Sequence, residues 1–185
     1  MGASLKTTGI TTFNFEKLTE GLKTAFLGKT QLLDQKQVEE KIQTAISSVN
    51  EAKNETLTAD GKKFLAENSK RPGVKTTASG LQYEVLREGT GLKPIATDSV
   101  LVNYKGTLLN GKQFDSSYDR GEPITLTLGQ VIKAWTEGLQ LMPKGSKYKF
   151  FVPYNLGYGA RGAGQDIPPY STLIFEIELL KVNGK

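Results

Sequence analysis

The chain has 185 residues and a formal net charge of +5, and 37% of its residues are hydrophobic and 23% charged. These proportions are ordinary for a soluble protein of one or two domains, and no segment approaches the ~20 consecutive apolar residues of a membrane-spanning helix. The chain contains no cysteine and no histidine, which excludes disulfides, Cys-based zinc sites and nucleophilic machinery of the Ser-His-Asp or Cys-His type. Carboxylate chemistry, lysine chemistry, or catalysis without proton transfer or covalent bonds remains.

The N-terminal segment Met1–Ile10 has no apolar core of signal-peptide length. The chain as given is therefore expected either in the cytoplasm or as a mature or trimmed form of an exported protein. Lysines and arginines are spread along the chain among acidic residues, and the nearest approach to a basic cluster is Lys70-Arg71, with Lys62-Lys63 shortly before it. We interpret both pairs as solvated helix faces, so we expect no nucleic-acid partner and rank nucleic-acid binding last among the alternatives.

Apolar residues at spacings of three and four predict a helix over residues 15–27, with Gly28 as its stop. A second helical segment is predicted over residues 34–70. Asp34 and Gln37 have the spacing of a capping box at its start, and the proline of Pro72-Gly73 disfavours helical backbone in the residue before it. One long helix and two helices with a break in the middle, near Asn54, both remain open.

The helices of residues 1–70 cannot enclose a core by themselves, because so few residues rarely form an unsupported domain. Their apolar stripes therefore need a partner. The stripes either pack on the C-terminal part of the chain or associate with a second copy, so that helices from two chains complete one core. We prefer self-association as a homodimer.

Residues 71–80 are interpreted as a linker, and beyond them the apolar period changes to two. Strands are expected over residues 81–86, 100–105, 124–128, 147–153 and 172–182. Asn110-Gly111 is a strong signal for a two-residue hairpin turn. A single short helix over residues 131–142 stands among these strands and does not alternate with them. This order indicates an α+β fold, in which an antiparallel sheet wraps around that helix.

A long loop from Tyr158 to Pro169 has no apolar period and closes with two prolines. Such a loop in a compact domain is usually functional or disordered, and Tyr158 and Ile167 argue against disorder. Aromatic residues from separate segments are candidates for what the loop covers: Tyr104, Phe114, Trp135 and Phe175. They are either ordinary core residues or the lining of one aromatic pocket, to which Asp115 and Arg120 give a polar edge.

Six groups of residues follow one another in a family order: Tyr104-Lys-Gly106-Thr-Leu108, Gly111-Lys-Gln-Phe114-Asp115-Ser116-Ser117, Val131-Ile132-x-x-Trp135-x-Glu137-Gly138-Leu139, Met142-Pro-x-Gly145, Tyr158-Gly159-x-x-Gly162 and Ile167-Pro168-Pro169-x-Ser171-Thr172-Leu173-Ile174-Phe175-Glu176. Together they resemble the FKBP family of peptidyl-prolyl cis-trans isomerases over about residues 80–183. The N-terminal part is similar to the helical dimerisation domain of bacterial FKBPs of the macrophage infectivity potentiator type.

The resemblance implies a domain plan. Residues 1–70 would be the helical dimerisation domain with its stalk helix, residues 71–80 the linker, and residues 81–185 an isomerase domain with the FKBP fold. Met1–Ile10 resembles the middle of the first helix of the family's dimerisation domain. A natural chain that begins further upstream, with a signal for the bacterial periplasm or cell envelope, is therefore an expectation.

The resemblance also implies rotation of X-Pro bonds in unfolded or partly folded proteins, without a cofactor or a metal. Trp135 would be the floor under the proline ring, Tyr158 would donate to a substrate carbonyl, and Asp115 would be oriented by its neighbours. The catalytic residues it implies are Asp115, Tyr158, Trp135, Phe114 and Tyr104. The substrate-binding residues it implies are Val131, Ile132, Ile167, Phe175, Arg120 and Ile124.

Some positions depart from the family. Ile124 stands where many members carry an aromatic wall residue, and Lys133-Ala134 replaces the more usual Pro-Gly or Arg-Gly before the tryptophan. Affinity for macrolide inhibitors such as rapamycin and the preferred residue before proline therefore stay open. The competing function is a holdase-type chaperone or peptide-binding adaptor with an inert pocket. Both functions can coexist, with the helical part binding clients.

Overall fold

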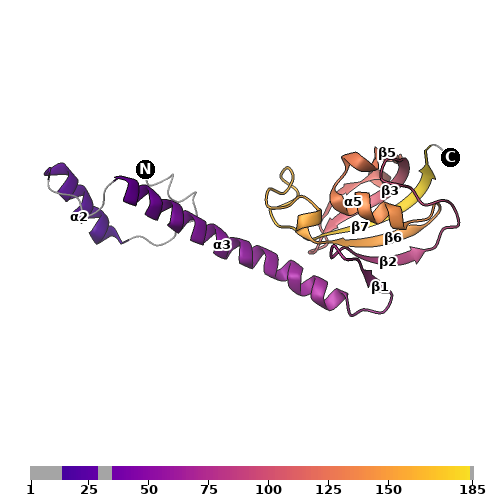
Figure 1. Ribbon diagram of the computed structural model, residues 1–185, viewed down its shortest axis with the longest axis horizontal. Helices are drawn as coiled ribbons and strands as arrows, with labels where there is room; N and C mark the ends of the chain where they lie inside the picture. Colours follow the sequence, from indigo (N-terminus) through magenta and orange to yellow (C-terminus); the bar gives the residue numbers. More distant parts are fainter. Residues whose placement is uncertain (1–13, 29–34, 184–185) are drawn as a thin grey trace. The chain divides into compact units, whose positions relative to one another are not determined.

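The computed structural model describes residues 14–28 and 35–183. The chain divides into two compact units, residues 1–56 and residues 57–185 (Figure 1). The first unit holds helices, and the second is built on a β-sheet. Among the described helices, none combines the length and the apolar character that crossing a membrane requires.

Helix α2 spans Phe15–Phe26 and confirms the helix predicted over residues 15–27. The side-chain oxygen of Asn14 accepts a hydrogen bond from the backbone N–H of Lys17 at 2.9 Å. This bond satisfies one of the donors that have no partner within the first turn of a helix. Gly28 follows with a φ of 64°, the left-handed conformation in which many helices end.

Helix α3 spans Gln35–Asn68 without a break, so the single long helix is the correct alternative for residues 34–70. The expected capping box begins at Asp34, which lies outside the described residues. The helix ends shortly before Pro72, as the restriction on the residue before proline predicts.

The second unit contains one antiparallel sheet with the strand order β1-β2-β6-β7-β3-β4, and β5 also pairs with β3. The strands are β1 (Val74–Thr76), β2 (Gln82–Arg87), β3 (Ser99–Leu108), β4 (Gln113–Ser116), β5 (Ile124–Thr127), β6 (Lys147–Val152) and β7 (Leu173–Val182). Buried residues alternate along β3 and β7, which places one face of the sheet on the core. The expected α+β fold with an antiparallel sheet is confirmed.

Helix α5 (Lys133–Leu141) lies against one face of this sheet (Figure 1). Trp135 and Leu139 on this helix are buried in the core. Gly138 brings the helix close to β6, because a Cβ at this position would lie 2.7 Å from the ring of Phe150. The predicted helix of residues 131–142 thus begins slightly late, since Val131 is extended.

Three details differ from the sequence-based expectations. The expected linker of residues 71–80 contains β1, which pairs with β2. The turn between β3 and β4 covers residues 109–112 and is longer than a two-residue hairpin, with a bulge at Gly106/Thr107. Single helical turns, too short to show a period in the sequence, also occur: α4 (Ser117–Arg120), η1 (Leu128–Gln130) and η2 (Tyr154–Leu156).

Gly138→Ala is expected to lower the free energy of unfolding of the sheet unit by about 1–3 kcal/mol. The new Cβ would overlap the ring of Phe150, which is 2% exposed and has no room to withdraw. This overlap outweighs the roughly 1 kcal/mol by which alanine exceeds glycine in a helix. Urea unfolding followed by the fluorescence of Trp135, the single tryptophan, measures the change. Gly129→Ala is the matched control, because its nearest neighbour would be 3.9 Å away. Equal midpoints for the two variants would contradict this packing.

Candidate active site

A pocket of about 300 Å³ opens beside α5 and collects side chains from β3, β4, β5, β7 and the loop after η2. Its lining consists of Tyr104, Phe114, Asp115, Ile124, Leu126, Gln130, Val131, Ile132, Trp135, Tyr158 and Phe175. Every residue expected at the site belongs to this lining except Arg120 and Ile167. Residues that are far apart in the sequence therefore meet at one hollow, and most of them are apolar or aromatic.

Two aromatic rings pack directly against Trp135, which is 7% exposed. Its ring centroid lies 5.0 Å from that of Tyr104 and 5.3 Å from that of Phe175, both nearly perpendicular to it. Phe114 packs on Phe175 in the same edge-to-face manner at 5.5 Å. Such arrangements are the favoured geometry of aromatic pairs. Among the described residues, the indole Nε1 of Trp135 has no hydrogen-bond partner.

Gly106 allows two of these rings to come together over β3. A Cβ at this position would lie 2.6 Å from the ring of Phe114 and 2.9 Å from that of Phe175. Gly106 pairs with Phe175 on β7 and with Asp115 on β4, so the missing side chain leaves space where three strands present site residues.

The polar edge of the pocket is a triad of Asp115, Tyr104 and Arg120. The hydroxyl of Tyr104 and the guanidinium of Arg120 both donate hydrogen bonds to the carboxylate of Asp115. Arg120 also donates to the hydroxyl oxygen of Tyr104 at 2.9 Å. The single turn α4, capped by Ser116, returns the chain so that Arg120 reaches Asp115. Arg120 therefore orients the carboxylate without lining the pocket.

These contacts set the protonation states of the site. Burial opposes ionisation of Asp115, but the hydrogen bonds from Tyr104 and Arg120 outweigh it and hold the pKa of this carboxyl below its usual range. Burial, with the neighbouring carboxylate of Asp115 as a lesser cause, raises the pKa of the hydroxyl of Tyr158. Burial and the hydrogen bond to Asp115 likewise raise the pKa of Tyr104. At neutral pH the pocket thus holds one carboxylate and two neutral phenols.

The loop after η2 brings Tyr158 into the pocket, where its side chain is 39% exposed. Within the loop, Ala163 and Ile167 exchange backbone hydrogen bonds of 2.9 and 3.1 Å. Gly162 has a φ of 68°, and a Cβ there would lie 2.2 Å from the carbonyl oxygen of Ile167. Ile167 itself is buried in the core. It supports the loop from beneath and is not part of the pocket lining.

Two lining residues were missed in the sequence. Leu126 lies two residues after Ile124 on β5, so the period-two pattern of a strand could have placed both on the same face. Gln130 lies in the short helix η1 and carries no periodic signal, and only the folded chain brings it to the pocket.

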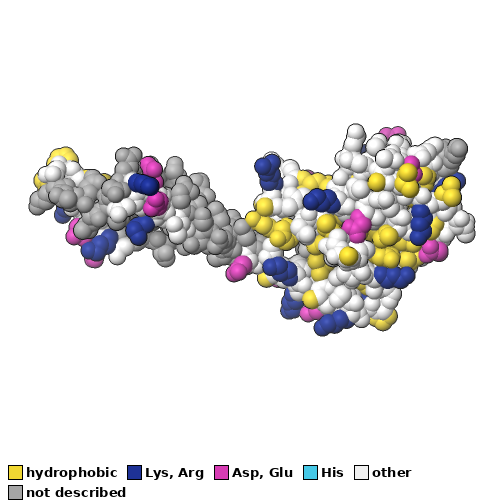
Figure 2. All heavy atoms as spheres, viewed as in Figure 1, with side chains coloured by type: hydrophobic (Ala, Val, Ile, Leu, Met, Phe, Trp, Pro, Cys, Tyr) yellow, Lys and Arg dark blue, Asp and Glu magenta, His cyan; other side chains and the backbone are white. Residues whose placement is uncertain are grey.

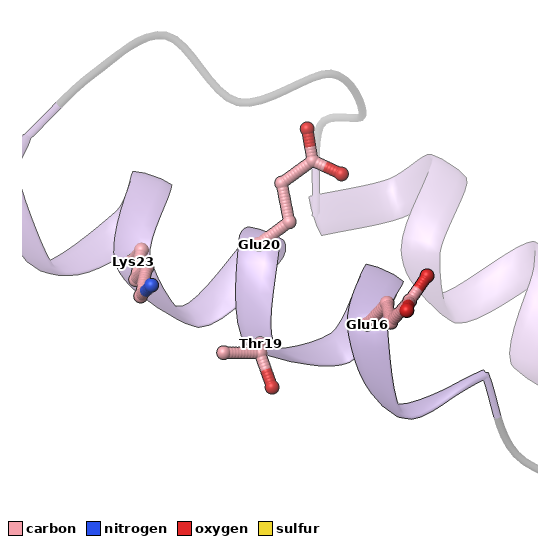
Figure 3. A pocket seen from close by; sticks show the side chains of 4 residues that line it. All are labelled: Glu16, Thr19, Glu20 and Lys23. Carbon is pink, nitrogen blue, oxygen red and sulfur yellow. The ribbon is translucent and has the colours of Figure 1, made fainter.

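A second hollow lies on α2 and is bordered by Glu16, Thr19, Glu20 and Lys23 (Figure 3). All four come from one helix, and Figure 3 shows their side chains pointing away from one another. The carboxylate of Glu20 is already paired with Lys17 at 2.8 Å. This hollow brings no functional groups together. Among the described residues, no cluster of acidic side chains has the arrangement of a metal site.

Known families match both parts of the chain. The family described as FKBP-type peptidyl-prolyl cis-trans isomerase matches residues 91–180. The family described as the domain amino terminal to FKBP-type peptidyl-prolyl isomerase matches residues 1–85. The crystal structure of FkpA from Escherichia coli superimposes with a TM-score of 0.68 and 41% identity, covering 97% of this chain and 86% of that one.

Curated relatives agree with these matches. The FKBP-type peptidyl-prolyl cis-trans isomerase FkpA of Aeromonas hydrophila is 48% identical over 163 residues, which are 84% of this chain but only 60% of the relative. The FKBP-type 22 kDa peptidyl-prolyl cis-trans isomerase of Escherichia coli is 41% identical over 185 residues, covering 98% of this chain and 90% of the relative. The outer membrane protein MIP of Legionella longbeachae is 40% identical over 189 residues, covering 98% of this chain and 81% of the relative. With this similarity along both of its parts, the chain belongs to the FKBP family of peptidyl-prolyl cis-trans isomerases.

Proposed function

We propose that this chain accelerates rotation about X-Pro peptide bonds in unfolded or partly folded proteins. The observation that carries the proposal is the pocket around Trp135, in which aromatic walls surround a space of about 300 Å³ and the Asp115 carboxylate lies at the edge. The described lining contains no histidine or cysteine that could act as a nucleophile or as a base near neutral pH. Bond rotation requires neither.

The physical basis is the electronic structure of the amide. Resonance gives the peptide bond a rotation barrier of about 18–20 kcal/mol, so uncatalysed X-Pro isomerisation takes tens to hundreds of seconds. Twisting breaks this resonance and reduces the charge separation between oxygen and nitrogen. An apolar pocket therefore favours the twisted amide over the planar one, and this difference is catalysis. Lowering the barrier by ~4 kcal/mol already accelerates rotation about 10³-fold.

Roles follow from the placement of the side chains. Trp135 is the floor for the proline ring, and Tyr104, Phe114 and Phe175 are walls with Val131, Ile132 and Ile124. Tyr158 donates its hydroxyl to a substrate carbonyl, for which its raised pKa keeps the proton in place. Asp115, held ionised by Tyr104 and Arg120, faces the amide electrostatically. Ile167 shapes the loop that carries Tyr158.

We also propose that the chain forms a homodimer through its N-terminal helices. The side chains of Leu22, Phe26 and Leu27 on and after α2 are 64%, 90% and 61% exposed, which is unusual for apolar residues so close together. Two comparisons support the proposal: residues 1–85 match the N-terminal domain family, and the structure of FkpA superimposes over 97% of this chain. Two pockets in one dimer would raise the effective affinity for a client with several prolines.

Chaperone activity is the second candidate, and the same exposed apolar side chains on α2 favour it, because they offer a surface for unfolded segments. In this proposal the helical part holds clients while the sheet unit isomerises them. Nucleic-acid binding gains no support from the visible face of the molecule, where Figure 2 shows basic and acidic side chains scattered among one another. Macrolides such as rapamycin are proposed competitors for the pocket.

Tyr158→Phe is expected to lower kcat/KM on a proline peptide about fivefold to tenfold. Losing one hydrogen bond to the substrate costs about 1 kcal/mol, and 1.4 kcal/mol corresponds to a factor of ten. Tyr118→Phe is the matched control, because Tyr118 is a half-exposed tyrosine that contacts Glu178 outside the pocket. A refolding assay on a client limited by proline isomerisation gives the second readout. If micromolar wild-type protein accelerates neither the isomerisation of the peptide nor the refolding of the client, the catalytic proposal is wrong.

We expect kcat/KM to be nearly independent of pH around neutrality. Because the pKa of Asp115 is lowered and the pKa values of Tyr104 and Tyr158 are raised, none of the three changes its proton between pH 6 and 9. We expect kcat/KM, measured by a protease-free peptide assay, to vary less than about twofold over this range. The stabilisation from the Asp115 contacts is present above its unfolded pKa of about 3.9 and is lost only as the pH falls below that value. A bell-shaped profile near neutrality would point instead to general acid–base catalysis.

Phe26→Glu is expected to turn the dimer into a monomer, because it places a charge in an apolar interface where that charge has no partner. Light scattering on the full chain measures the mass. Thr19→Glu changes an exposed residue of the same helix outside the apolar group and should leave the dimer intact. A variant at Phe26 that keeps the wild-type mass would show that this surface is not the interface.

A further inference from the structure

The end of α3 is part of the sheet unit. From Leu57 onward the helix belongs to residues 57–185, and Thr58 and Asn68 are almost completely buried. The ring of Phe64 lies 5.8 Å from that of Phe151 on β6. The last turns of the helix thus pack on the same sheet that carries the pocket, although the sequence assigns them to a stalk.

Two buried amides fix this helix end to β2. The Nδ2 of Asn68 donates to the Oε1 of Gln82 at 2.8 Å, and the Nε2 of Gln82 donates to the backbone carbonyl of Leu65 at 2.8 Å. Arg71 donates to the Oδ1 of Asn68 at 2.7 Å. Because a buried amide that loses its partner is costly, the two bonds of Gln82 hold the helix end on β2, and the bond from Arg71 fixes the side chain of Asn68.

One turn further back, the backbone of α3 meets the start of β7. A Cβ added to Gly61 would lie 2.2 Å from the Oγ1 of Thr172 and 3.3 Å from its Cβ. Thr172 is buried, and its hydroxyl occupies the space that a side chain at position 61 would need. A glycine at position 61 is therefore required for this close approach of helix and loop.

Thr172 is the last residue of the loop that carries Tyr158. The backbone N–H of Tyr170 donates to the carbonyl of Gly159 at 2.9 Å, which ties the end of the loop to its beginning. The ring of Tyr170 also packs on Tyr154, with centroids 5.3 Å apart. Thr172 is thus connected to Tyr158 by a short path: Tyr170 lies two residues before Thr172, and its partner Gly159 directly follows Tyr158.

We infer that Gly61 is a positioning residue for the isomerase site: because position 61 has no side chain, Thr172 and the end of the loop lie where they place Tyr158 in the pocket. A hollow of about 290 Å³ beside this contact is lined by Asp60, Gly61, the β3–β4 turn and residues 168–172, so the loop has free space next to its support. The inference rests on the proposed role of Tyr158. According to this inference, the end of α3 affects catalysis by positioning Tyr158 and does not itself contact the substrate.

The test is a cycle of variants in the full chain, assayed for kcat and KM on a proline peptide. Gly61→Ala is expected to lower kcat at least fivefold and to change KM less than twofold, because the displaced hydroxyl acts in the transition state. The kcat of Thr172→Ala should stay within threefold of the wild-type kcat, because this change creates no overlap. In the double variant Gly61→Ala/Thr172→Ala, kcat should recover to within threefold of the wild-type value. The nearest remaining atom of residue 172 is then its Cβ, at 3.3 Å from the added Cβ.

A second cycle separates positioning from simple destabilisation. In a Tyr158→Phe background, Gly61→Ala should have no further effect on kcat, since the hydroxyl that it displaces is already absent. A variant that merely loosens the unit would lower kcat in both backgrounds. Gly21→Ala on α2, where an added Cβ meets nothing within 4 Å, controls for the general effect of alanine in a helix.

The outcomes distinguish this inference from the proposed function. A wild-type chain without isomerase activity defeats the proposed function, and equal kcat for wild type and Tyr158→Phe defeats the role of Tyr158. Two outcomes with an active wild type overturn the inference alone. Either the kcat of Gly61→Ala stays within twofold of the wild-type kcat, or the double variant does not recover kcat. If Gly61→Ala does not fold, Thr172→Val replaces the hydroxyl by a larger methyl group. It should then lower kcat at least twofold, and no loss would equally overturn the inference.

Discussion

The packing of Trp135 against Tyr104 and Phe175 is the contact on which the pocket depends. The three rings come from α5, β3 and β7, and the ring of Trp135 meets each of the other two edge to face. This geometry exists only when the helix lies on the sheet, so forming the core and forming the site are one event. Two glycines make it possible, since a Cβ at Gly106 or Gly138 would overlap an aromatic ring.

Around this aromatic centre the chain places few polar groups, and the charged one among them is held by hydrogen bonds. Asp115 receives hydrogen bonds from Tyr104 and Arg120, so a carboxylate stays charged at the edge of an apolar space. The loop with Tyr158 is closed by its own backbone hydrogen bonds. The proposed catalysis would therefore act on a bound amide through the apolar surroundings of the pocket and not through a reactive side chain.

The end of α3 shows how a local signal and a tertiary contact differ. Proline at position 72 predicts correctly where the helix ends, because the restriction acts on neighbouring residues. Nothing in the apolar spacing shows that Gly61 meets Thr172, more than a hundred residues later in the chain. The contacts of Phe64 and Asn68 group this part of the helix with the sheet, whereas the sequence interpretation assigned it to the helical domain.

The sequence by itself determined the helix of residues 15–27, the alternation of β3, the α+β class and the family, because period, turn residues and ordered motifs are local properties of the chain. It also named most of the residues that now line the pocket. Only the tertiary structure decided that residues 34–70 form one helix, that Gln130 and Leu126 join the pocket, and that Ile167 lies beneath the loop. The residues of the pocket and the place of Ile167 depend on which distant segments pack together, and spacing along the chain does not show this.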